Sequence, residues 1–328
     1  MTIYDIAEAA GVSASTVSRV INNKEGVRRE TKERVLKYLD MYQYSPNETA
    51  RSLVNQATKI IGILITDMRT THHTDGVYYM EREFVNLGYC CIIMNTGTEE
   101  ESKANYIQIL SQRRVEAAVM IGSTFQTEFV KRAIEKYMPT TPVIFANGYL
   151  DLPNVYGVIA DEQAGVANCV KLLAERNRKN LAFIIDKYTP SNRLKQLGFE
   201  RGVLQWCNQS EPLIVKSESS LQGSYDATCQ LVKEHPEVNG IIYVVDLLAV
   251  GGIRALHDMD IDIPDQIAVI GVDNSIYAKI CTPRLTSLDN RLLDLSVTAA
   301  RNLIDVLEEK HVTKNMMILS SIAEREST

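Results

Sequence analysis

The sequence predicts an α/β protein in which a small helical head precedes two doubly wound parallel sheets. The first observation behind this prediction is a pair of short amphipathic helix patterns between Thr2 and Asn23, joined by a tight turn, which is typical of a helix-turn-helix. The second is the alternation of short apolar strands with amphipathic helices from Lys59 onward, which indicates parallel sheets covered on both faces. The chain of 328 residues is long enough for two or three domains.

The helix-turn-helix pattern starts at the beginning of the chain. Thr2 can cap the first helix, Gly11 can adopt the positive φ that a tight turn needs, and Ser13 can cap the second helix. The apolar positions of the two helices are Ile3, Ile6, Ala9 and Ala10, followed by Val17, Val20 and Ile21. Because Ser15 and Arg19 fall on other faces of the second helix, we interpret it as a recognition helix with small side chains at its tip.

A third helix and a conditional fourth complete the N-terminal part. The third helix is expected over Glu30–Tyr42, with a buried stripe of Val35, Leu36, Leu39 and Tyr42. Ser45, Pro46 and Glu48 then form a capping-box pattern that favours a new helix. Since that helix could run only about ten residues, and isolated helices below roughly 12–15 residues are marginal, we expect it to need a partner. The expected boundaries are a head at 1–45 and a hinge helix with linker at 46–58.

The remaining chain, 59–328, reads as two doubly wound subdomains with a cleft between them. The candidate strands are Ile60–Thr66, Tyr89–Met94, Val115–Ile121, Pro142–Ala146, Val155–Ile159, Leu181–Asp186, Leu213–Lys216, Gly240–Val245 and Ile267–Gly271. Helices are expected between most of them, for example at Val77–Leu87, Ser102–Arg113 and Val166–Arg176. The tail segments Leu285–Asp289 and Met316–Leu319 could supply crossover strands. The N-subdomain is expected at about 59–159 plus 290–319, and the C-subdomain at about 160–289 plus 320–328.

Charge and composition limit the class of protein. The net charge is −6, but residues 1–58 carry +1, so the acidity belongs to the larger part. No apolar run reaches the roughly 18 residues that span a membrane, and no signal-peptide pattern begins the chain, so we expect a cytoplasmic protein without membrane contact. The six cysteines show no C-x-x-C pairing and lie mostly in apolar runs, which favours reduced core thiols over disulfides or zinc ligands.

Several stretches resemble one family of bacterial transcription factors. Thr-Ile-Tyr-Asp-Ile-Ala at 2–7, Thr-Val-Ser-Arg-Val-Ile-Asn at 16–22 and Tyr-Ser-Pro-Asn at 44–47 are similar to the lactose/galactose repressor family, as are Val-Asp-Asn at 272–274 and the terminal Ile-Ala-Glu-Arg-Glu-Ser at 322–327. The resemblance implies a homodimer whose paired heads bind a pseudo-palindromic DNA operator. It also implies a C-terminal part of periplasmic-binding-protein type that binds a small effector, such as a sugar or sugar derivative.

The resemblance also implies roles for residues of the head and hinge. Arg19 occupies the position where the family contacts a base edge, and Ala14 and Ser15 occupy positions that often carry larger, operator-selecting side chains. Leu53 matches the leucine that the family inserts into the minor groove to kink the duplex, although a linker residue packed on the effector domain is the alternative. Expected contacts to the DNA backbone, or positions in the hinge, are Thr2, Ser13, Thr16, Asn22, Arg28, Arg29, Asn47 and Ala50.

The expected effector site departs from the family pattern. His72 and His73 replace the usual residues after the first strand; effector contact, a surface loop and metal ligation are the alternatives, with metal disfavoured because sequence neighbours point apart. Lys195 stands where the family usually has an arginine, and Arg193 could substitute for it. Asp246 and Asp273 follow apolar runs, where parallel sheets bind ligands, although loop or helix capping would also explain them. Asp161 lies near an acidic family position, which a shift of one residue would assign to Ala160.

Three other functions remain as alternatives. A solute-binding protein without DNA function would need neither Arg19 nor Leu53, and an enzyme would need a catalytic constellation that the sequence does not show. Control by a partner protein near Ile276–Thr282 is disfavoured, since Thr282 stands where such relatives have a basic residue. We expect no enzymatic activity, no cofactor and no bound metal. A dimer is favoured over a tetramer because no leucine heptad follows the terminal motif.

Overall fold

The computed structural model describes residues 2–21, 24–44, 58–207 and 211–328. The chain divides into two units, residues 1–58 and 59–328, which are described separately. Among the described residues, no helix is long and apolar enough to cross a membrane.

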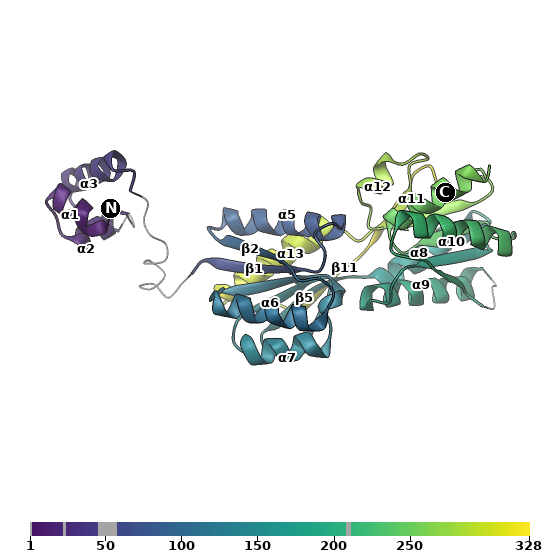
Figure 1. The fold of residues 1–328 in the computed structure, drawn as a ribbon, viewed down its shortest axis with the longest axis horizontal. Coiled ribbons are helices and arrows are strands. Elements are labelled where there is room, and N and C mark those ends of the chain that lie inside the picture. The colour runs from purple at the N-terminus through teal and green to yellow at the C-terminus, as the bar shows by residue number, and fades with distance from the viewer. Residues whose placement is uncertain (1, 22–23, 45–57, 208–210) are drawn as a thin grey trace. The chain divides into compact units, whose positions relative to one another are not determined.

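The first unit is a bundle of short helices around a small core (Figure 1). Helices α1 (Ile3–Ala10), α2 (Ala14–Ile21) and α3 (Arg29–Met41) bury Ile6, Ala7, Ala10, Val17, Val20 and Val35. Thr2 and Asp5 form a capping box at the start of α1, and Gly11 ends that helix with φ 61°. One part of the expected stripe on α3 is wrong. Leu36 and Tyr42 are 46% and 38% exposed, because Val35, Tyr38 and Leu39 fill the small core instead.

The second unit begins with a six-stranded sheet in the order β11-β5-β4-β3-β1-β2, all parallel. Its strands are β1 (Ile60–Ile65), β2 (Cys90–Asn95), β3 (Ala117–Ile121), β4 (Val143–Ala146), β5 (Val155–Ala160) and β11 (Asn315–Ile318). Figure 1 shows α5 (Thr71–Asn86) and α13 (Leu292–Leu307) on one face, and α6 (Glu100–Gln112) and α7 (Glu128–Tyr137) on the other. A short 3₁₀ turn, η1 (Ser123–Phe125), follows β3.

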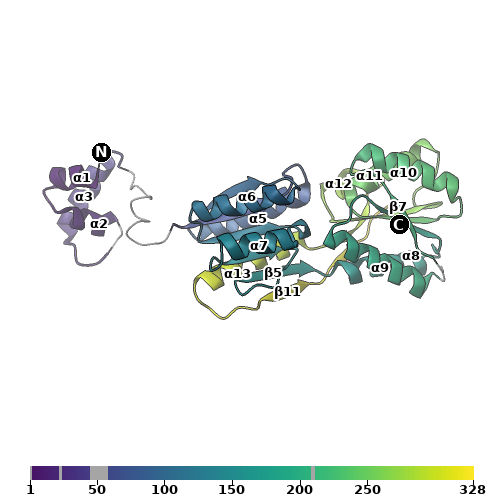
Figure 2. The ribbon, with the colours of Figure 1, turned by 60° about the horizontal axis from the view of Figure 1, so that its bottom comes forward.

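A second six-stranded sheet has the order β12-β10-β9-β8-β6-β7. Its strands are β6 (Leu181–Ile185), β7 (Leu213–Lys216), β8 (Gly240–Tyr243), β9 (Ala268–Val272), β10 (Thr286–Asp289) and β12 (Ser321–Ala323), and only β12 runs antiparallel. Helices α8 (Glu162–Glu175) and α9 (Pro190–Trp206) cover one face, while α10 (Leu221–Glu234) and α11 (Asp246–Asp258) cover the other (Figure 2). The short α12 (Ile276–Ile280) follows β9.

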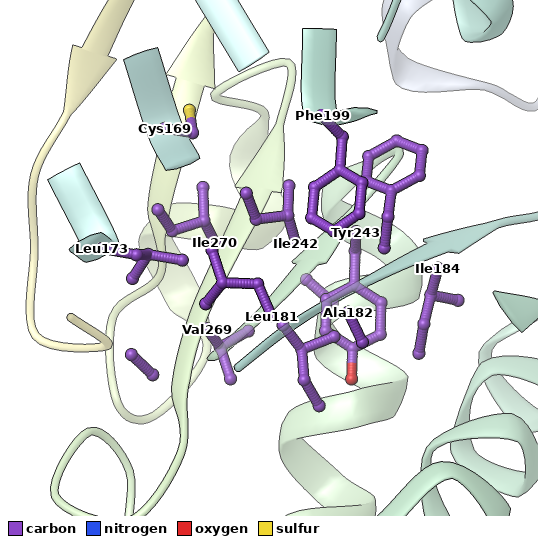
Figure 3. Close-up of a cluster of buried hydrophobic side chains, with 14 of the residues drawn as sticks. Cys169, Leu173, Leu181, Ala182, Ile184, Phe199, Ile242, Tyr243, Val269 and Ile270 are labelled. Atoms are coloured by element: carbon purple, nitrogen blue, oxygen red, sulfur yellow. The ribbon is translucent and has the colours of Figure 1, made fainter. Parts of the chain in front are cut away.

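The core of this second sheet is mostly apolar, and the hydroxyl group of Tyr243 lies within it. Phe183 and Phe199 stack with their ring centroids 5.3 Å apart, which locks α9 onto the sheet. Figure 3 shows Tyr243 among Ile242, Leu181 and Ala182. Its hydroxyl group forms a 2.9 Å hydrogen bond with Thr228, so the buried oxygen is satisfied. This packing holds the ends of the strands in place, and with them the loops that follow the strands.

The structure confirms the predicted doubly wound α/β fold and corrects some details. Each expected strand overlaps an observed one, and the tail segments supply β10 and β11. The short strand β12 was not expected. Helix α5 begins at Thr71 and not at Val77, so the two histidines lie in its first turn. The expectation that the cysteines are mostly core thiols holds only for Cys169 and Cys207, which are buried, whereas Cys90 is exposed and the others are half-buried.

Candidate functional site

The exposed surface of the head carries a cluster of hydroxyl groups at the start of α2. Ser13 Oγ accepts a hydrogen bond from the Thr16 amide at 3.2 Å, which is the expected helix cap, and lies 2.8 and 2.9 Å from the hydroxyl oxygens of Ser15 and Thr16. Arg19 is exposed one turn later, while Val17 and Val20 anchor the opposite side of the helix in the core. A helix N-terminus with donors beside it suits a phosphate group, and an exposed arginine suits a base edge.

The other described head residues that were predicted to contact DNA have varied surroundings. Ala14 is half-buried against the core of the head, and the Thr2 hydroxyl group caps α1. Arg28 is exposed at the start of α3, whereas Arg29 pairs with Glu33 at 2.9 Å. The predictions for Asn22, Asn47, Ala50 and Leu53 lie outside the described residues.

A buried ion pair lies beneath the loops that connect the two sheets. Glu162, the first residue of α8, is 2% exposed, and Lys195 of α9 is 3% exposed. Their charged atoms are 3.6 Å apart, and Lys195 Nζ also donates to the carbonyl oxygen of Val244 at 3.2 Å. Burial alone would lower the pKa of Lys195, but the carboxylates of Glu162, Asp273 and Asp186 raise it above its ordinary value. The lysine therefore stays charged and holds α9 against α8.

Glu162 also connects the two subdomains. Its Oε1 accepts hydrogen bonds from Ser191 Oγ at 2.7 Å, from Asn147 Nδ2 at 3.3 Å and from Asn290 Nδ2 at 3.4 Å. Asn147 follows β4 of the first sheet, whereas Ser191 belongs to α9 beside the second sheet. A further hydrogen bond of 3.1 Å joins the Ser191 amide to Ser123 Oγ after β3. The carboxylate is thus shared between elements that belong to different sheets.

The crossover segments between the sheets are bonded to one another. Ser320 Oγ donates to the carbonyl oxygen of Asp161 at 3.3 Å and to Asn290 Oδ1 at 3.1 Å. Asn290 Nδ2 donates in turn to Asp273 Oδ1 at 3.2 Å, as well as to Glu162. Asp161, Asn290 and Ser320 each lie where the chain passes from one sheet to the other, so one chain of hydrogen bonds connects Asp273 to all three crossovers.

Asp246 joins the loop after β9 to strand β10. It is 1% exposed and accepts hydrogen bonds from Ser275 N at 2.7 Å, from Ser275 Oγ at 2.8 Å and from Ser287 Oγ at 2.6 Å. Burial, reinforced by the nearby charge of Asp273, raises the pKa of Asp246 to about 7. Asp273 itself has a positive φ of 102°, an uncommon conformation for a side chain with a Cβ atom. The network around it holds this loop in a strained shape.

Beside Asp273 lies a pocket of about 570 Å³ between the subdomains. Helix α5 contributes one wall through Thr71, His72, Asp75 and Tyr79. The other walls come from residues after β9 and around the crossovers: Asp273, Asn274, Ser275, Ile276, Lys279, Asp289, Arg291, Leu292, Leu293, Asp294 and Ser321. The size is that of a small-molecule site, and the lining is mostly polar and charged.

Some of the pocket's charges are already neutralised by neighbours. Arg291 pairs with Asp294 at 2.7 Å, and its amide donates to Asp289 at 2.7 Å. Asp289 also accepts from Asn274 at 3.0 Å. Of the lining carboxylates, Asp75 and Asp273 remain the ones most available to a ligand.

The structure brings some of the predicted effector residues together and separates others. His72 and Asp273 line the pocket, whereas Lys195 and Asp246 lie behind it in the buried network. His73 turns away, and its Nδ1 lies 2.9 Å from the carbonyl oxygen of Asp67 and 2.6 Å from Thr70 Oγ1. Burial lowers the pKa of His73 to about 4, so its ring is neutral.

Two predicted residues are not part of either group. Asp161 caps α8, accepting a hydrogen bond from the Ala164 amide at 3.1 Å. Arg193 is exposed on α9 and lies 3.8 Å from Glu200. Within the described parts of the chain, no three histidine, cysteine or acidic side chains are grouped so that they could hold a metal ion.

Comparison with known proteins decides the family. Residues 2–47 match the model of "Bacterial regulatory proteins, lacI family", and residues 170–328 match the "Periplasmic binding protein-like domain". An HTH-type transcriptional regulator of Lachnoclostridium phytofermentans is 30% identical over 335 residues, covering 100% of this chain and 99% of that protein. The chain belongs to the lacI family of bacterial regulatory proteins. It is therefore a DNA-binding transcriptional regulator, in a family whose members repress transcription under the control of a small effector.

Other lacI-family proteins agree over their whole length. The ribose operon repressor of Halalkalibacterium halodurans is 28% identical and is matched over 100% of this chain and 97% of its own. The crystal structure of the lac repressor dimer bound to operator and the anti-inducer ONPF has a TM-score of 0.90 at 21% identity, covering 100% of this chain and 98% of that one. This structural likeness supports the fold from the head to the last strand.

In the buried network of this lacI-family protein, sequence reasoning missed Glu162, Asn147, Ser191 and Asn290. In the pocket it missed Asp75, Tyr79 and Lys279. Glu162 looked like an ordinary acidic residue in the first turn of a helix, where it is favourable for the helix dipole. Only the packing of α9 on α8 shows that it is buried. For Lys195 a signal was present: Asn192, Lys195 and Phe199 follow the helical period of a buried face, and Arg193 does not.

Proposed function

We propose that the protein is a repressor whose affinity for its operator changes when a small polyhydroxylated molecule, such as a sugar, occupies the pocket beside Asp273. The observation that carries this proposal is the position of the pocket. It is lined from both subdomains, and Asp273 at its edge is hydrogen bonded to Asn290, which joins the crossovers. A ligand that binds Asp273 can therefore favour one arrangement of the subdomains over another, which is the requirement for a switch.

The lining favours a neutral ligand rich in hydroxyl groups. Asp75 and Asp273 can accept hydrogen bonds from hydroxyls, Lys279 and His72 can donate to them, and Tyr79 offers a flat apolar surface. An anionic ligand would meet an excess of carboxylates here. We assign direct contact to His72 and Asp273, and supporting roles behind them to Lys195 and Asp246. His73, Asp161 and Arg193 lie outside this arrangement.

For the head, we propose that Arg19 reads a base in the major groove, while Ser13, Thr16 and Arg28 contact phosphates. Two heads of a homodimer would read the halves of a pseudo-palindromic operator. Leu53 is proposed to enter the minor groove between the half-sites and to kink the DNA. Such a regulator works in the cytoplasm, where its operator is.

The pocket is tested by a thermal-shift screen of the full-length protein against neutral mono- and disaccharides, sugar acids and nucleobases. A ligand at 100 times its Kd should add about 2.7 kcal/mol of stability. Tyr79→Ala should weaken the binding of the ligand found, whereas Tyr225→Ala, at a half-buried tyrosine of α10 outside this pocket, should not. Stabilisation only by acidic ligands, or equal binding to both variants, would contradict the assignment of the pocket.

The hinge is tested separately from the pocket. DNA bending by Leu53→Ala should be smaller than by the parent protein in a gel assay with a centrally placed operator. An unchanged bend with unchanged affinity would show that Leu53 does not enter the DNA.

A further inference from the structure

The turn that follows β9 has an unusual backbone. Asp273 and Asn274 are adjacent, and both have a positive φ, of 102° and 48°. Asparagine tolerates the left-handed region, but the φ of Asp273 lies beyond it. Such backbone shapes persist where surrounding groups fix them. Because both residues line the pocket, the groups that fix this turn also shape the pocket.

The backbone of the turn is held by the neighbouring strand β10. The Asp273 amide donates to the carbonyl oxygen of Leu288 at 2.8 Å, and the Asn274 amide donates to Ser287 Oγ at 2.9 Å. Both acceptors belong to β10. These hydrogen bonds fix the position of the two amides, but they do not orient the side chain of Asn274.

The Asn274 side chain is held at both ends of its amide group. Its Nδ2 donates to Asp289 Oδ2 at 3.0 Å, and its Oδ1 accepts from Arg325 Nη2 at 2.5 Å. Since a guanidinium group only donates and a carboxylate only accepts, only this orientation of the amide group satisfies both partners. Asn274 therefore connects Arg325 to Asp289, which also lines the pocket.

Arg325 is itself anchored beside β10. Its amide donates to Thr286 Oγ1 at 2.8 Å, and its Nη1 donates to the carbonyl oxygen of Leu285 at 2.6 Å. Leu285 is fully buried, so this end of the guanidinium group is held by the core. Because the group is a rigid planar fork, its bond to Leu285 sets the direction in which it donates to Asn274.

We propose that Arg325 is a positioning residue of the pocket, which holds the Asn274 amide group and, through it, the turn that presents Asp273 to a ligand. The described residues that line the pocket do not include Arg325, so its effect passes through Asn274. This role rests on the sugar pocket proposed above. The affinity for a sugar then depends on a side chain that the sugar does not touch.

A matched control lies on the same terminal segment of the chain. Arg176, at the end of α8, donates through Nη1 to Thr328 Oγ1 at 2.7 Å and pairs through Nη2 with Glu324. Arg176→Met removes a guanidinium group that holds this segment but leaves Asn274 with both of its partners. Arg325→Met removes the guanidinium group that reaches the turn.

Hydrogen exchange of the full-length protein, measured by mass spectrometry, tests whether Arg325 holds the turn. In Arg325→Met, we expect the segment 272–280 to exchange about tenfold faster or more, the factor that corresponds to one hydrogen bond to a charged group. Exchange in β8, Gly240–Tyr243, should not change, because only local opening is increased. Arg176→Met should leave both segments unchanged.

Calorimetry on the same variants tests whether the turn matters for binding. The probes are D-glucose, D-xylose, D-ribose and cellobiose, each titrated alone. In Arg325→Met, the Kd of a sugar that the parent protein binds should rise by about tenfold. Arg325→Lys is the milder variant, for use if the Met variant does not fold. It keeps the charge, but its compact ammonium group cannot reproduce the fork, so it should also weaken binding, by less.

Each contrary outcome has a separate meaning. Faster exchange with an unchanged sugar Kd in the Arg325 variants would show that Arg325 is merely structural. Unchanged exchange in segment 272–280 would show that the turn is held without Arg325. Equal losses of affinity in Arg176→Met would show a general loosening of the terminal segment. A parent protein that bound none of the sugars would count against the sugar pocket itself, and the exchange rates would then decide alone whether Arg325 holds the turn.

Discussion

Removing Lys195 while keeping Glu162 should destabilise the effector domain strongly. In Lys195→Met, the Glu162 carboxylate stays buried and retains only neutral donors, from Ser191, Asn147 and Asn290. Breaking a buried pair in this way typically costs about 3–5 kcal/mol. Glu162→Gln should cost less, about 1–3 kcal/mol, because Lys195 keeps the Val244 carbonyl group and lies near two further carboxylates.

Urea unfolding, followed by fluorescence, measures these costs. Trp206, the only tryptophan in the sequence, ends α9 and packs against the core of the second sheet, so it reports on this subdomain. The double variant Lys195→Met/Glu162→Gln should be at least about 1 kcal/mol more stable than the sum of the single changes predicts, since it removes the unpaired charge. Additive losses, or a loss below about 1 kcal/mol in Lys195→Met, would refute the claim that this ion pair organises the site.

Three further predictions follow from other positions. Since the pKa of Asp246 is raised to about 7, the folded state holds this proton more tightly than the unfolded chain does, and stability should fall as the pH rises from about 4 to about 7. Asp246→Asn should flatten this dependence of the melting temperature on pH. An unchanged dependence would contradict the raised pKa of Asp246. A Cβ atom at Gly198 would lie 2.3 Å from the Gln163 carbonyl oxygen, so Gly198→Ala should push α9 away from α8. The free energy of unfolding in urea should fall by about 1–3 kcal/mol, and an unchanged value would contradict this close contact. Arg19→Ala should lower discrimination at one base pair by about 1–3 kcal/mol in a binding-site selection, and a retained preference would remove its role as a base reader.

The fold was predictable because its strands are continuous apolar runs separated by amphipathic helices. Two of the details that failed had weak signals in the sequence. Strand β12 has only three residues, Ser321–Ala323, and pairs with β10 through the tertiary fold. The first turn of α5 reads Thr-His-His-Thr-Asp, which has no apolar period, and it is helical because the following residues pack on the sheet.

The site was less predictable, because its chemistry depends on pairs that are distant in sequence. The resemblance to the family directed attention to Asp273 and Lys195, but it could not show that Glu162 neutralises Lys195 from another helix. Likewise, the hydrogen bond between Asn290 and Glu162 joins residues 128 positions apart. Burial and neutralisation of charge are properties of packing, and no local pattern in the sequence records them.

We propose that the binding of a ligand in the pocket beside Asp273 and the binding of an operator by the head are energetically coupled. The most direct test is calorimetric titration of the stabilising sugar into the full-length protein, with and without saturating operator DNA. Thermodynamic linkage requires that operator DNA change the affinity for the sugar by the same factor as the sugar changes the affinity for the operator. We predict equal factors of at least about fivefold, the lower end of typical coupling. A sugar affinity that is the same with and without operator DNA would contradict the claim.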